Sequence, residues 1–319
     1  MTVVLVKSKL RRLYYSCFHA SQKLLGYPRA HKVFMTFHGY PLDLENPLAH
    51  NEWIVHKMIK DRNPLLIETA DKVRVRDYVR RKLGEDLSDR VLIPVYHISD
   101  SVEKIPFSKL PEEYFMKANH FSGANKLVTS NDKPSEIQKL AKSWLDSTYR
   151  QKDHEWAYGQ IKPRVLFEKV LRTPNGKIPQ DIKFYFWHGR LKMILFVEDR
   201  YEDMRWFFCD ENFKEIKGAQ VHDVKGADGA RIPTNISEMK ELAAKLASDF
   251  DYCRIDLYEI EGKIFFGEIT HYTGGGCWQF SDINTDYVLG QFWKKENSDK
   301  NYFELYKEFE KSNNFQPSN

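Results

Sequence analysis

The most constraining feature of this chain is a strand–turn–strand pattern over residues 254–270, where apolar and polar residues alternate on both sides of Gly262. Side chains of a strand point alternately to opposite faces, so the turn length decides which residues share a face. A two-residue turn would place Asp256 and Glu268 on opposite faces. A three-residue loop ending at Gly262 is the next commonest hairpin connection, and it pairs residue 256 with residue 266. We therefore expect a hairpin with a three-residue loop.

In this register the hairpin has one polar and one apolar face. Two carboxylates beside a hydroxyl suit a hard divalent cation, and Mg²⁺ with nucleotide phosphates is the usual occupant. A solvated sheet face with one Arg–Asp ion pair is the alternative, and the hairpin alone leaves both open. The polar face is expected to carry Arg254, Asp256, Glu268 and Thr270, and the apolar face Ile255, Leu257, Phe265 and Ile269.

The composition is that of a globular protein. With 319 residues, of which 42% are hydrophobic, the chain can bury a sizeable core in two or three subdomains. The net charge of +4 does not indicate nucleic-acid binding. The four cysteines follow neither a CxxC pattern nor a zinc spacing, which favours a reducing compartment. No apolar run reaches membrane-spanning length, and Lys7 and Lys9 interrupt any signal-peptide core, so we expect a cytoplasmic protein.

Positive charge is concentrated near the N-terminus. Residues 1–32 contain seven Lys or Arg and no Asp or Glu, and their apolar residues recur near helical spacing. A basic amphipathic helix either lies on an anionic membrane surface or packs its apolar stripe on its own domain. The sequence leaves both open, so peripheral contact with the inner face of the membrane is one expectation for this segment.

Periodicity and turn residues predict a mixture of helices and strands, which favours α+β lobes over regular βαβ winding. Helices are expected within residues 1–60 with an interruption near 38–41, and at 71–83 with Asp71 as N-cap, 135–149, 238–250, 286–293 and 302–311. Besides the hairpin, strands are expected at 91–96, 114–119, 164–170, 182–187, 191–197 and 206–208.

Three further segments carry residues that suit nucleotide binding. Lys117 ends a predicted strand before a Gly-containing loop at 120–125, whose backbone N–H groups would drape over phosphates. Residues 167–170 end a strand where a linker between lobes would expose backbone groups to an adenine edge. Lys183 stands in an otherwise apolar strand and needs an anionic partner. A turn beside a surface lysine, an edge strand and an exposed sheet face are the respective alternatives.

In this order the features resemble the ATP-grasp fold, and residues from about 46 to 276 resemble the ATP-grasp family associated with teichuronopeptide biosynthesis, the TupA-like family. The resemblance implies an α+β fold in which two lobes with largely antiparallel sheets sandwich ATP, after a helical N-terminal segment. No single motif is specific to the family, but the order and spacing of the whole set of motifs are. The matching motifs are Asn63-Pro64-Leu65, residues 71–76, residues 117–123, Glu155-Trp156, residues 161–164, Asp181-Ile182-Lys183, and the hairpin with its Arg-x-Asp and Gly-Glu-x-Thr.

The same resemblance divides the chain into five regions. They are an N-terminal helical segment at 1–62, a connecting region at 63–105, a smaller ATP-grasp lobe at 106–170, a larger lobe with the metal site at 171–290, and a C-terminal helix and tail at 291–319.

The resemblance also assigns eight residues to the nucleotide. Three lysines would contact its phosphates, a serine–glycine loop would close over them, and the end of a strand would bind adenine. In that order they are Lys72, Lys117 and Lys183, then Ser122 and Gly123, then Glu168, Lys169 and Val170.

For the metal and the chemistry, the resemblance points to the hairpin. Asp256 and Glu268 would hold Mg²⁺ at the phosphates. The family usually has Asn two positions after this glutamate, whereas this chain has Thr270, so the third ligand departs from the family pattern. Arg254, together with Lys117, would stabilise charge that develops on the transferred phosphoryl group or on a tetrahedral intermediate.

Two other groups are candidate substrate contacts. Gly274, Gly275 and Gly276 follow the hairpin and would let a substrate approach the backbone, with a flexible turn as the alternative. Arg200 and Arg205 would clamp an acidic substrate, or belong to a loop of ion pairs.

The expected function is therefore an ATP- and Mg²⁺-dependent ligase that joins a carboxylate to an amine through an acylphosphate. The family association implies a uronic acid of a cell-surface polysaccharide or its precursor, amidated with an amino acid or amine, or glutamate units joined to one another. One alternative is a kinase on the same fold that phosphorylates a sugar. Another is a non-catalytic nucleotide-binding component of a polysaccharide assembly complex. A glycosyltransferase, suggested by the acidic cluster at residues 199–203, is the weakest.

Overall fold

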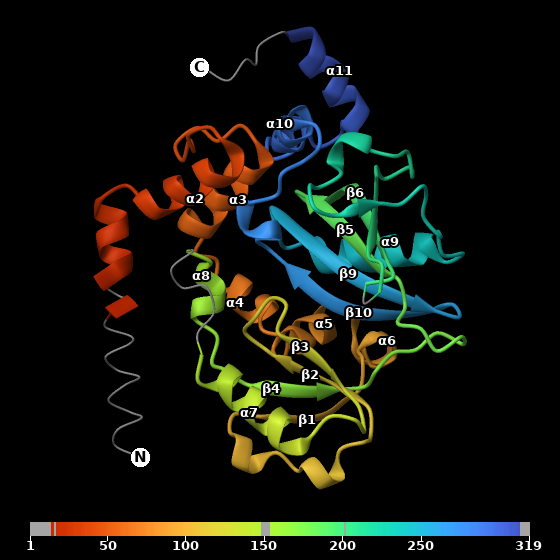
Figure 1. Ribbon diagram of the computed structural model, residues 1–319. Helices are drawn as coiled ribbons and strands as arrows, with labels where there is room; N and C mark the ends of the chain where they lie inside the picture. Colours follow the sequence, from red (N-terminus) through yellow and green to blue (C-terminus); the bar gives the residue numbers. More distant parts are fainter. Residues whose placement is uncertain (1–13, 16, 148–153, 201, 313–319) are drawn as a thin grey trace.

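The computed structural model describes residues 14–15, 17–147, 154–200 and 202–312, which form two largely antiparallel sheets surrounded by helices (Figure 1). The smaller sheet has the strand order β1-β4-β2-β3, and the larger has β10-β9-β5-β6-β7-β8. This is the α+β architecture that the sequence predicts. The strands are β1 Val95–Ser99, β2 Tyr114–Ala118, β3 Asn125–Val128, β4 Val165–Glu168, β5 Asp181–Trp187, β6 Arg190–Glu198, β7 Arg205–Cys209, β8 Lys225–Gly226, β9 Tyr252–Ile260 and β10 Lys263–Thr270.

Helices lie around both sheets (Figure 1). The α-helices are α2 Pro28–His38, α3 His50–Lys60, α4 Leu65–Ala70, α5 Val75–Leu83, α6 Glu85–Val91, α7 Pro134–Leu145, α8 Trp156–Gly159, α9 Ile236–Ala247, α10 Ile283–Gln291 and α11 Tyr302–Ser312. The 3₁₀ helices are η1 Val102–Lys104, η2 Phe107–Lys109, η4 Lys217–Ala219, η5 Thr273–Gly276 and η6 Lys295–Asn297.

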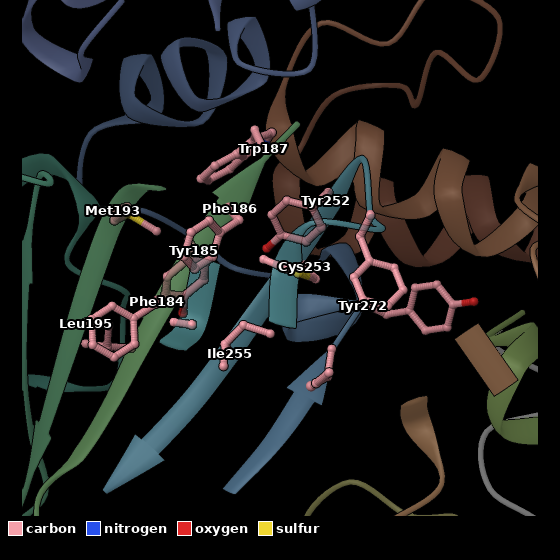
Figure 2. Close-up of a cluster of buried hydrophobic side chains, with 14 of the residues drawn as sticks. Phe184, Tyr185, Phe186, Trp187, Met193, Leu195, Tyr252, Cys253, Ile255 and Tyr272 are labelled. Carbon is pink, nitrogen blue, oxygen red and sulfur yellow. The ribbon is translucent and has the colours of Figure 1, made fainter. Parts of the chain in front are cut away.

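The core of the larger sheet is built on β5, which is buried at all seven positions between β9 and β6. Helix α9 packs on β9, β5 and β6. A strand covered on both faces needs a nearly continuous apolar run, and β5 has one apart from its first residue and Lys183. Figure 2 shows Phe184, Trp187 and Tyr252 within this cluster. The burial fixes β5 and β9 as a rigid support for the polar residues that they carry.

The smaller sheet has a core of its own with α7. Met116 of β2 and Phe167 of β4 are fully buried against Ile137 and Ala141 of the helix. Pro134 occupies the first helical position, where its missing N–H is not needed. Each sheet thus has its own hydrophobic core.

The N-terminal segment is only partly described. Residues 1–13 of the basic stretch lie outside the described residues, whereas residues 17–24 are helical. The predicted interruption near 38–41 is confirmed, because α2 ends at His38 and Gly39 follows it with a φ of 76°. In the described part of the chain, no helix is both long and apolar enough to cross a bilayer.

The β9–β10 hairpin corrects the predicted register. Its loop has two residues, Glu261 and Gly262, both with positive φ, as a type I′ turn requires. Residue 256 therefore does not pair with residue 266 as predicted. A bulge between Phe266 and Glu268 shifts the ladder by one residue and pairs Glu268 with Asp256, so these two carboxylates share a face as predicted, although in a different register.

The bulge also changes the apolar face. Phe266 pairs with Leu257 and is 4% exposed, whereas Phe265 pairs with Tyr258 and is half-buried. The prediction that Phe265 lies on the buried face is therefore wrong, because it assumed an unbroken alternation through Gly267. Ile255, Leu257 and Ile269 are buried as predicted.

Several predicted boundaries also move. The apolar run at 91–96 divides between the end of α6 and the start of β1, because a short apolar run does not distinguish strand from helix. The helix predicted at 71–83 begins at Val75, although the Asp71 carboxylate accepts a hydrogen bond from the Val73 amide as a cap would. Helix α7 ends at Leu145, and residues 148–149 of its predicted range lie outside the described residues.

Candidate active site

Arg254 joins the two carboxylates of the hairpin. Its Nε donates to Asp256 Oδ1 over 2.6 Å, and its Nη2 donates to Asp256 Oδ2 over 2.7 Å and to Glu268 Oε1 over 2.9 Å. Thr270 Oγ1 donates to the same Glu268 oxygen over 3.1 Å. All four side chains therefore share one face of the hairpin, and both carboxylates converge on a single nitrogen.

Lys183 extends this cluster onto β5. Its Nζ donates to Asp256 Oδ2 over 2.5 Å and to Asp181 Oδ2 over 2.6 Å. Residues 181 and 183 lie on the same face of β5 because they are two positions apart. Arg200 Nη1 donates to the same Asp181 oxygen over 3.0 Å. The anionic partner that Lys183 was expected to need is thus a pair of buried aspartates.

Asp181 was not predicted as a site residue. It is 1% exposed, and its Oδ1 has no hydrogen-bond partner within the described residues. A buried carboxylate oxygen without a donor is costly, so an acceptor of this kind is available to a ligand hydroxyl or amine. The signal in the sequence is its position two residues before Lys183 on one strand.

Lys72 connects the cluster to the smaller sheet. Its Nζ lies 4.0 Å from Glu268 Oε2 and donates to the Phe121 carbonyl over 2.6 Å. Asp71, the residue before Lys72, accepts hydrogen bonds from Asn119 Nδ2 and from Arg164 Nη2, and these bonds hold the backbone that carries Lys72 in place. The loop after β2 and the hairpin of the larger sheet thus meet at one lysine.

Lys117 lies one residue before the end of β2 and forms an ion pair with Glu168 of the neighbouring strand β4. The backbone amide of Lys169 donates to the Pro94 carbonyl over 2.9 Å, so this N–H is already used. A cavity between the sheets is lined by Lys117 and Glu168 from one side and by Asp181 and other residues of the larger lobe from the other. The predicted phosphate lysine and adenine segment therefore border the same space.

The charges in the cluster shift the pKa of several groups. Burial disfavours ionisation of Glu268, but the nearby Lys72, Arg254 and Lys183 outweigh it and hold the pKa of Glu268 well below its usual range. Burial raises the pKa of Asp256, and Arg254 and Lys183 oppose that shift. Burial also lowers the pKa of Lys72, which Glu268 partly offsets. The cluster is therefore a dense set of opposite charges that is buried at Asp256 and Arg254 and open to solvent at Glu268, so a bound phosphate or metal would reach it from the Glu268 side.

With this geometry established, the family can be assigned. A profile of the TupA-like ATP-grasp family matches residues 52–294, which include every residue of the cluster. The chain belongs to the TupA-like ATP-grasp family. The assignment agrees with the resemblance seen in the sequence motifs, and the two-sheet α+β architecture is the one that the resemblance implied.

Solved structures of ATP-grasp proteins are similar at a low level. D-alanine–D-alanine ligase from Bacillus anthracis, complexed with ATP, shares 14% identity and a TM-score of 0.42 over 76% of this chain and 68% of that one. The ATP-grasp ligase PsnB, complexed with its minimal precursor, shares 12% identity and a TM-score of 0.38 over 66% and 53%. N5-carboxyaminoimidazole ribonucleotide synthetase from Thermus thermophilus shares 10% identity and a TM-score of 0.36 over 64% and 45%. A search of curated proteins gives no match.

The donor set at the hairpin fits the Mg²⁺ that the family implies. Carboxylate and hydroxyl oxygens are the ligands that this ion prefers, and Asp256 and Glu268 are close enough to share one cationic nitrogen of Arg254. Among the described residues, no group of three or more His, Cys, Asp or Glu is arranged to hold a metal by itself. Phosphate oxygens or water would therefore complete the coordination, as is common for Mg²⁺ at nucleotides.

Three other predicted residues lie at the margins of the cluster or away from it. Arg200 reaches Asp181 and lines the cavity between the sheets, whereas Arg205 is half-exposed on β7 and pairs with Asp203. The structure does not bring Arg205 to the cluster. Ser122 lies in the exposed part of the loop after β2.

The glycine run borders a different space. Gly274, Gly275 and Gly276 all have positive φ values. Gly123, which lies in the separate loop after β2, also has a positive φ, of 77°. The three glycines of η5 line a second cavity, which faces α2 and α3. Val170, two residues after the end of β4, is buried.

Proposed function

We propose that this protein is an ATP- and Mg²⁺-dependent ligase that joins a carboxylate to an amine through an acylphosphate. The observation that carries the proposal is the convergence of Asp256 and Glu268 on one nitrogen of Arg254, with Lys72 beside them. Two carboxylates next to several cations, between two sheets, form a site for a metal-bound polyphosphate and not for a neutral ligand.

The reaction needs alignment and charge neutralisation more than a nucleophile from the protein. An oxygen of the substrate carboxylate would attack the γ-phosphorus of ATP, and the bond to the β,γ-bridging oxygen would break to release ADP. The amine nitrogen would then attack the acyl carbon, and phosphate would leave with that carboxylate oxygen while the nitrogen loses a proton. Aligned reactants and excluded water supply most of the acceleration in such a mechanism.

Different residues of the cluster would bind the phosphates, hold the metal and stabilise the developing charge. Lys72 and Lys117 would neutralise the phosphates, and Lys183 would add a contact from β5. Asp256 and Glu268, with Thr270, would hold Mg²⁺, which when bound withdraws charge from the phosphate oxygens. Arg254 would stabilise the charge that develops during transfer. The cavity between the sheets is 50 Å³, well below the roughly 300 Å³ of small-ligand pockets, so the side chains that line it would have to move when a nucleotide binds.

For the substrates, we propose a uronic acid of a cell-surface polysaccharide or its precursor as the carboxylate and an amino acid or amine as the nucleophile. The support is the family assignment and the cation-rich cluster. We further propose that the protein works in the cytoplasm at the inner membrane face. Leu24 and Leu25 are 86% and 67% exposed in the basic N-terminal segment, where apolar side chains would enter an anionic bilayer surface.

An isotope experiment tests the reaction. The protein is incubated with ATP, Mg²⁺, a uronate labelled with ¹⁸O in its carboxylate, and a panel of amines. We expect one ¹⁸O atom to appear in the released phosphate, and a hydroxamate to form when hydroxylamine replaces the amine. A uronate that acquires a stable phosphate on a hydroxyl would instead establish the kinase alternative.

The non-catalytic alternative makes a different prediction. A nucleotide-binding component would bind ATP without carboxylate-dependent release of ADP and phosphate. In cells, Asp256→Ala and Glu268→Ala variants that keep full function would support this alternative. The ligase proposal expects both variants to lose function while the protein remains folded.

A further inference from the structure

His271 is a buried polar residue that no step of the proposed reaction uses. It follows directly after β10, the strand that carries Glu268 and Thr270, and it is 1% exposed. Its Nε2 is hydrogen-bonded over 2.7 Å to Thr69 Oγ1 of α4, which is buried as well. A side-chain hydrogen bond between two distant segments of the chain therefore lies next to the candidate metal residues.

The donor in this hydrogen bond is the imidazole of His271. Thr69 Oγ1 donates its single hydrogen to the Leu65 carbonyl, one turn earlier in α4, over 2.8 Å. A hydroxyl has one hydrogen and two acceptor lone pairs, so Thr69 accepts the bond from His271. The imidazole thus carries a hydrogen on Nε2, and any replacement for His271 must offer a donor at this position.

The segment from Thr69 to Lys72 connects the two sheets. At its start, Thr69 is bonded to His271 after the last strand of the larger sheet. At its end, the Lys72 backbone amide donates to the Asn119 carbonyl over 3.1 Å, and the Asp71 carboxylate accepts from Asn119 Nδ2 over 2.9 Å. Asn119 directly follows β2 of the smaller sheet. This short segment is therefore fastened at its two ends to different sheets.

A second link joins the same segment to β10. Lys72 Nζ lies 4.0 Å from Glu268 Oε2. Lys72 follows Thr69 by three residues, and Glu268 precedes His271 by three, so the two links join the same stretches of chain. A long ion pair made by a flexible lysine does little to fix a backbone. The hydrogen bond between the buried side chains of Thr69 and His271 is the firmer of the two links.

We infer that His271 is a positioning residue for Lys72, the lysine proposed to bind the ATP phosphates. It acts through Thr69 and holds the segment that carries Lys72 at a fixed distance from Glu268. This inference rests on the proposed function, because it needs Lys72 to contact ATP. It gives His271 no contact with ATP, Mg²⁺ or either substrate.

A double-mutant cycle in nucleotide binding tests the inference. The ligand is adenylyl imidodiphosphate, a non-hydrolysable analogue of ATP, and its affinity is measured by calorimetry with Mg²⁺. The proteins are the unchanged protein, His271→Leu, Lys72→Met and the double variant. We expect Lys72→Met to weaken binding about tenfold, which is typical for the loss of a hydrogen bond to a charged group, and His271→Leu to weaken it nearly as much.

The double variant decides between positioning and an independent effect. If His271 acts through Lys72, the double variant binds the analogue no more weakly than Lys72→Met alone, because the two losses are one and the same. Additive losses would overturn the inference. An unchanged affinity in His271→Leu would overturn it as well.

Two further measurements distinguish positioning from a general loss of structure. Because Mg²⁺ bridges the β- and γ-phosphates of a nucleotide, Lys72 beside Glu268 should act on phosphates that AMP lacks. His271→Leu should therefore bind AMP as tightly as the unchanged protein does. His271→Gln offers an amide hydrogen near the position of Nε2 and should restore most of the affinity for the analogue. Equal losses for AMP and the analogue, or no difference between the Leu and Gln variants, would show a merely structural role.

Val288→Ala is the control for lost stability. Val288 is fully buried in α10, a helix that packs on α3, α11 and η4. This variant should lower the urea midpoint as a core truncation does, but it should leave the affinity for the analogue unchanged. If His271→Leu fails to fold, Thr69→Val breaks the same hydrogen bond from the other residue and takes its place in the cycle.

The outcomes separate this inference from the proposed function. None of the measurements needs ligase turnover, so a protein that binds the analogue but never forms an amide would overturn the proposed reaction alone. Additive losses in a protein with carboxylate-dependent turnover would overturn the role of His271 alone. An unchanged protein that does not bind the analogue would overturn both.

Discussion

Glu268 lies directly opposite Asp256 in the β9–β10 ladder, although the strands are joined by a two-residue turn that would otherwise separate them to opposite faces. The bulge at Gly267 makes the difference, because it adds one residue to β10 and reverses the alternation after Phe266. The candidate metal site therefore depends on one backbone irregularity as much as on its carboxylates.

A side chain at residue 267 should disturb both stability and ligand binding. A Cβ atom there would lie 3.0 Å from the Asp256 carbonyl oxygen and 3.1 Å from the Tyr258 ring. We expect Gly267→Ala to lower the free energy of unfolding by about 1–3 kcal/mol, the usual cost of overpacking, and to weaken ATP binding. Urea denaturation and calorimetry measure the two effects. Gly229→Ala, where a Cβ meets nothing within 4 Å, is the control and should change neither.

Variants of the Lys117–Glu168 ion pair should distinguish a structural role of Lys117 from a role in ATP binding. Lys117→Met leaves a largely buried carboxylate without its cation, which we expect to lower the free energy of unfolding by about 3–5 kcal/mol. The double variant Lys117→Met/Glu168→Leu should regain most of this stability, because both charges are removed. ATP binding should stay weak in both variants. Recovery of ATP affinity in the double variant would contradict the assignment of Lys117 to the phosphates.

Variants at Thr270 test whether this residue is a Mg²⁺ ligand in place of the Asn that the family usually has there. Its hydroxyl donates to Glu268, so Thr270→Val, which keeps the shape of the side chain, removes one hydrogen bond and one candidate Mg²⁺ ligand. We expect turnover to fall about tenfold or more at limiting Mg²⁺, with a smaller loss at saturating Mg²⁺. Thr270→Asn restores an oxygen ligand and should retain activity. A Val variant with an unchanged Mg²⁺ dependence would remove Thr270 from the metal site.

The stability of the fold should depend on pH through Asp286 of α10. Burial raises the pKa of Asp286 to about 7, while its Oδ1 accepts a hydrogen bond from the Asn51 amide over 3.0 Å. The folded state therefore holds this proton more tightly than the unfolded state, whose carboxyl has a pKa near 3.8. The contribution of this group to stability is complete below the unfolded pKa and is lost as the pH rises to about 7.

Asp286→Asn isolates that contribution, because the amide oxygen can still accept from Asn51. Between pH 5 and pH 8 the unchanged protein should lose about 3 kcal/mol more stability than the variant. Urea denaturation of both proteins at the two pH values gives this difference. Parallel pH profiles would show that Asp286 is ionised throughout the range.

Much of the fold and part of the site follow from local patterns. Strands β2, β5 and β6 were predicted close to their observed bounds, because apolar runs and clear turn residues mark them. Asp256 and Glu268 were predicted to share a face, but through the wrong loop. A glycine within a strand pattern is itself a signal for a bulge, and Gly267 could have suggested the observed register.

The remainder depends on contacts between distant segments. Lys72 lies 4.0 Å from Glu268, next to Asp71, which accepts hydrogen bonds from Asn119 and Arg164. No periodicity links these positions, and only the resemblance to the family placed Lys72 at the site. Asp181 was overlooked because its burial depends on the neighbouring strands of the larger sheet.

The central claim is that Asp256 and Glu268 hold Mg²⁺ together with ATP, and the Mg²⁺ dependence of ATP binding tests it most directly. Calorimetric titrations of ATP with Mg²⁺ and with a chelator are compared for the unchanged protein, Glu268→Gln, and the exposed control Glu241→Gln. Mg²⁺ should strengthen ATP binding at least tenfold in the unchanged protein and the control, and hardly at all in Glu268→Gln. An equal Mg²⁺ effect in all three proteins would contradict the metal site.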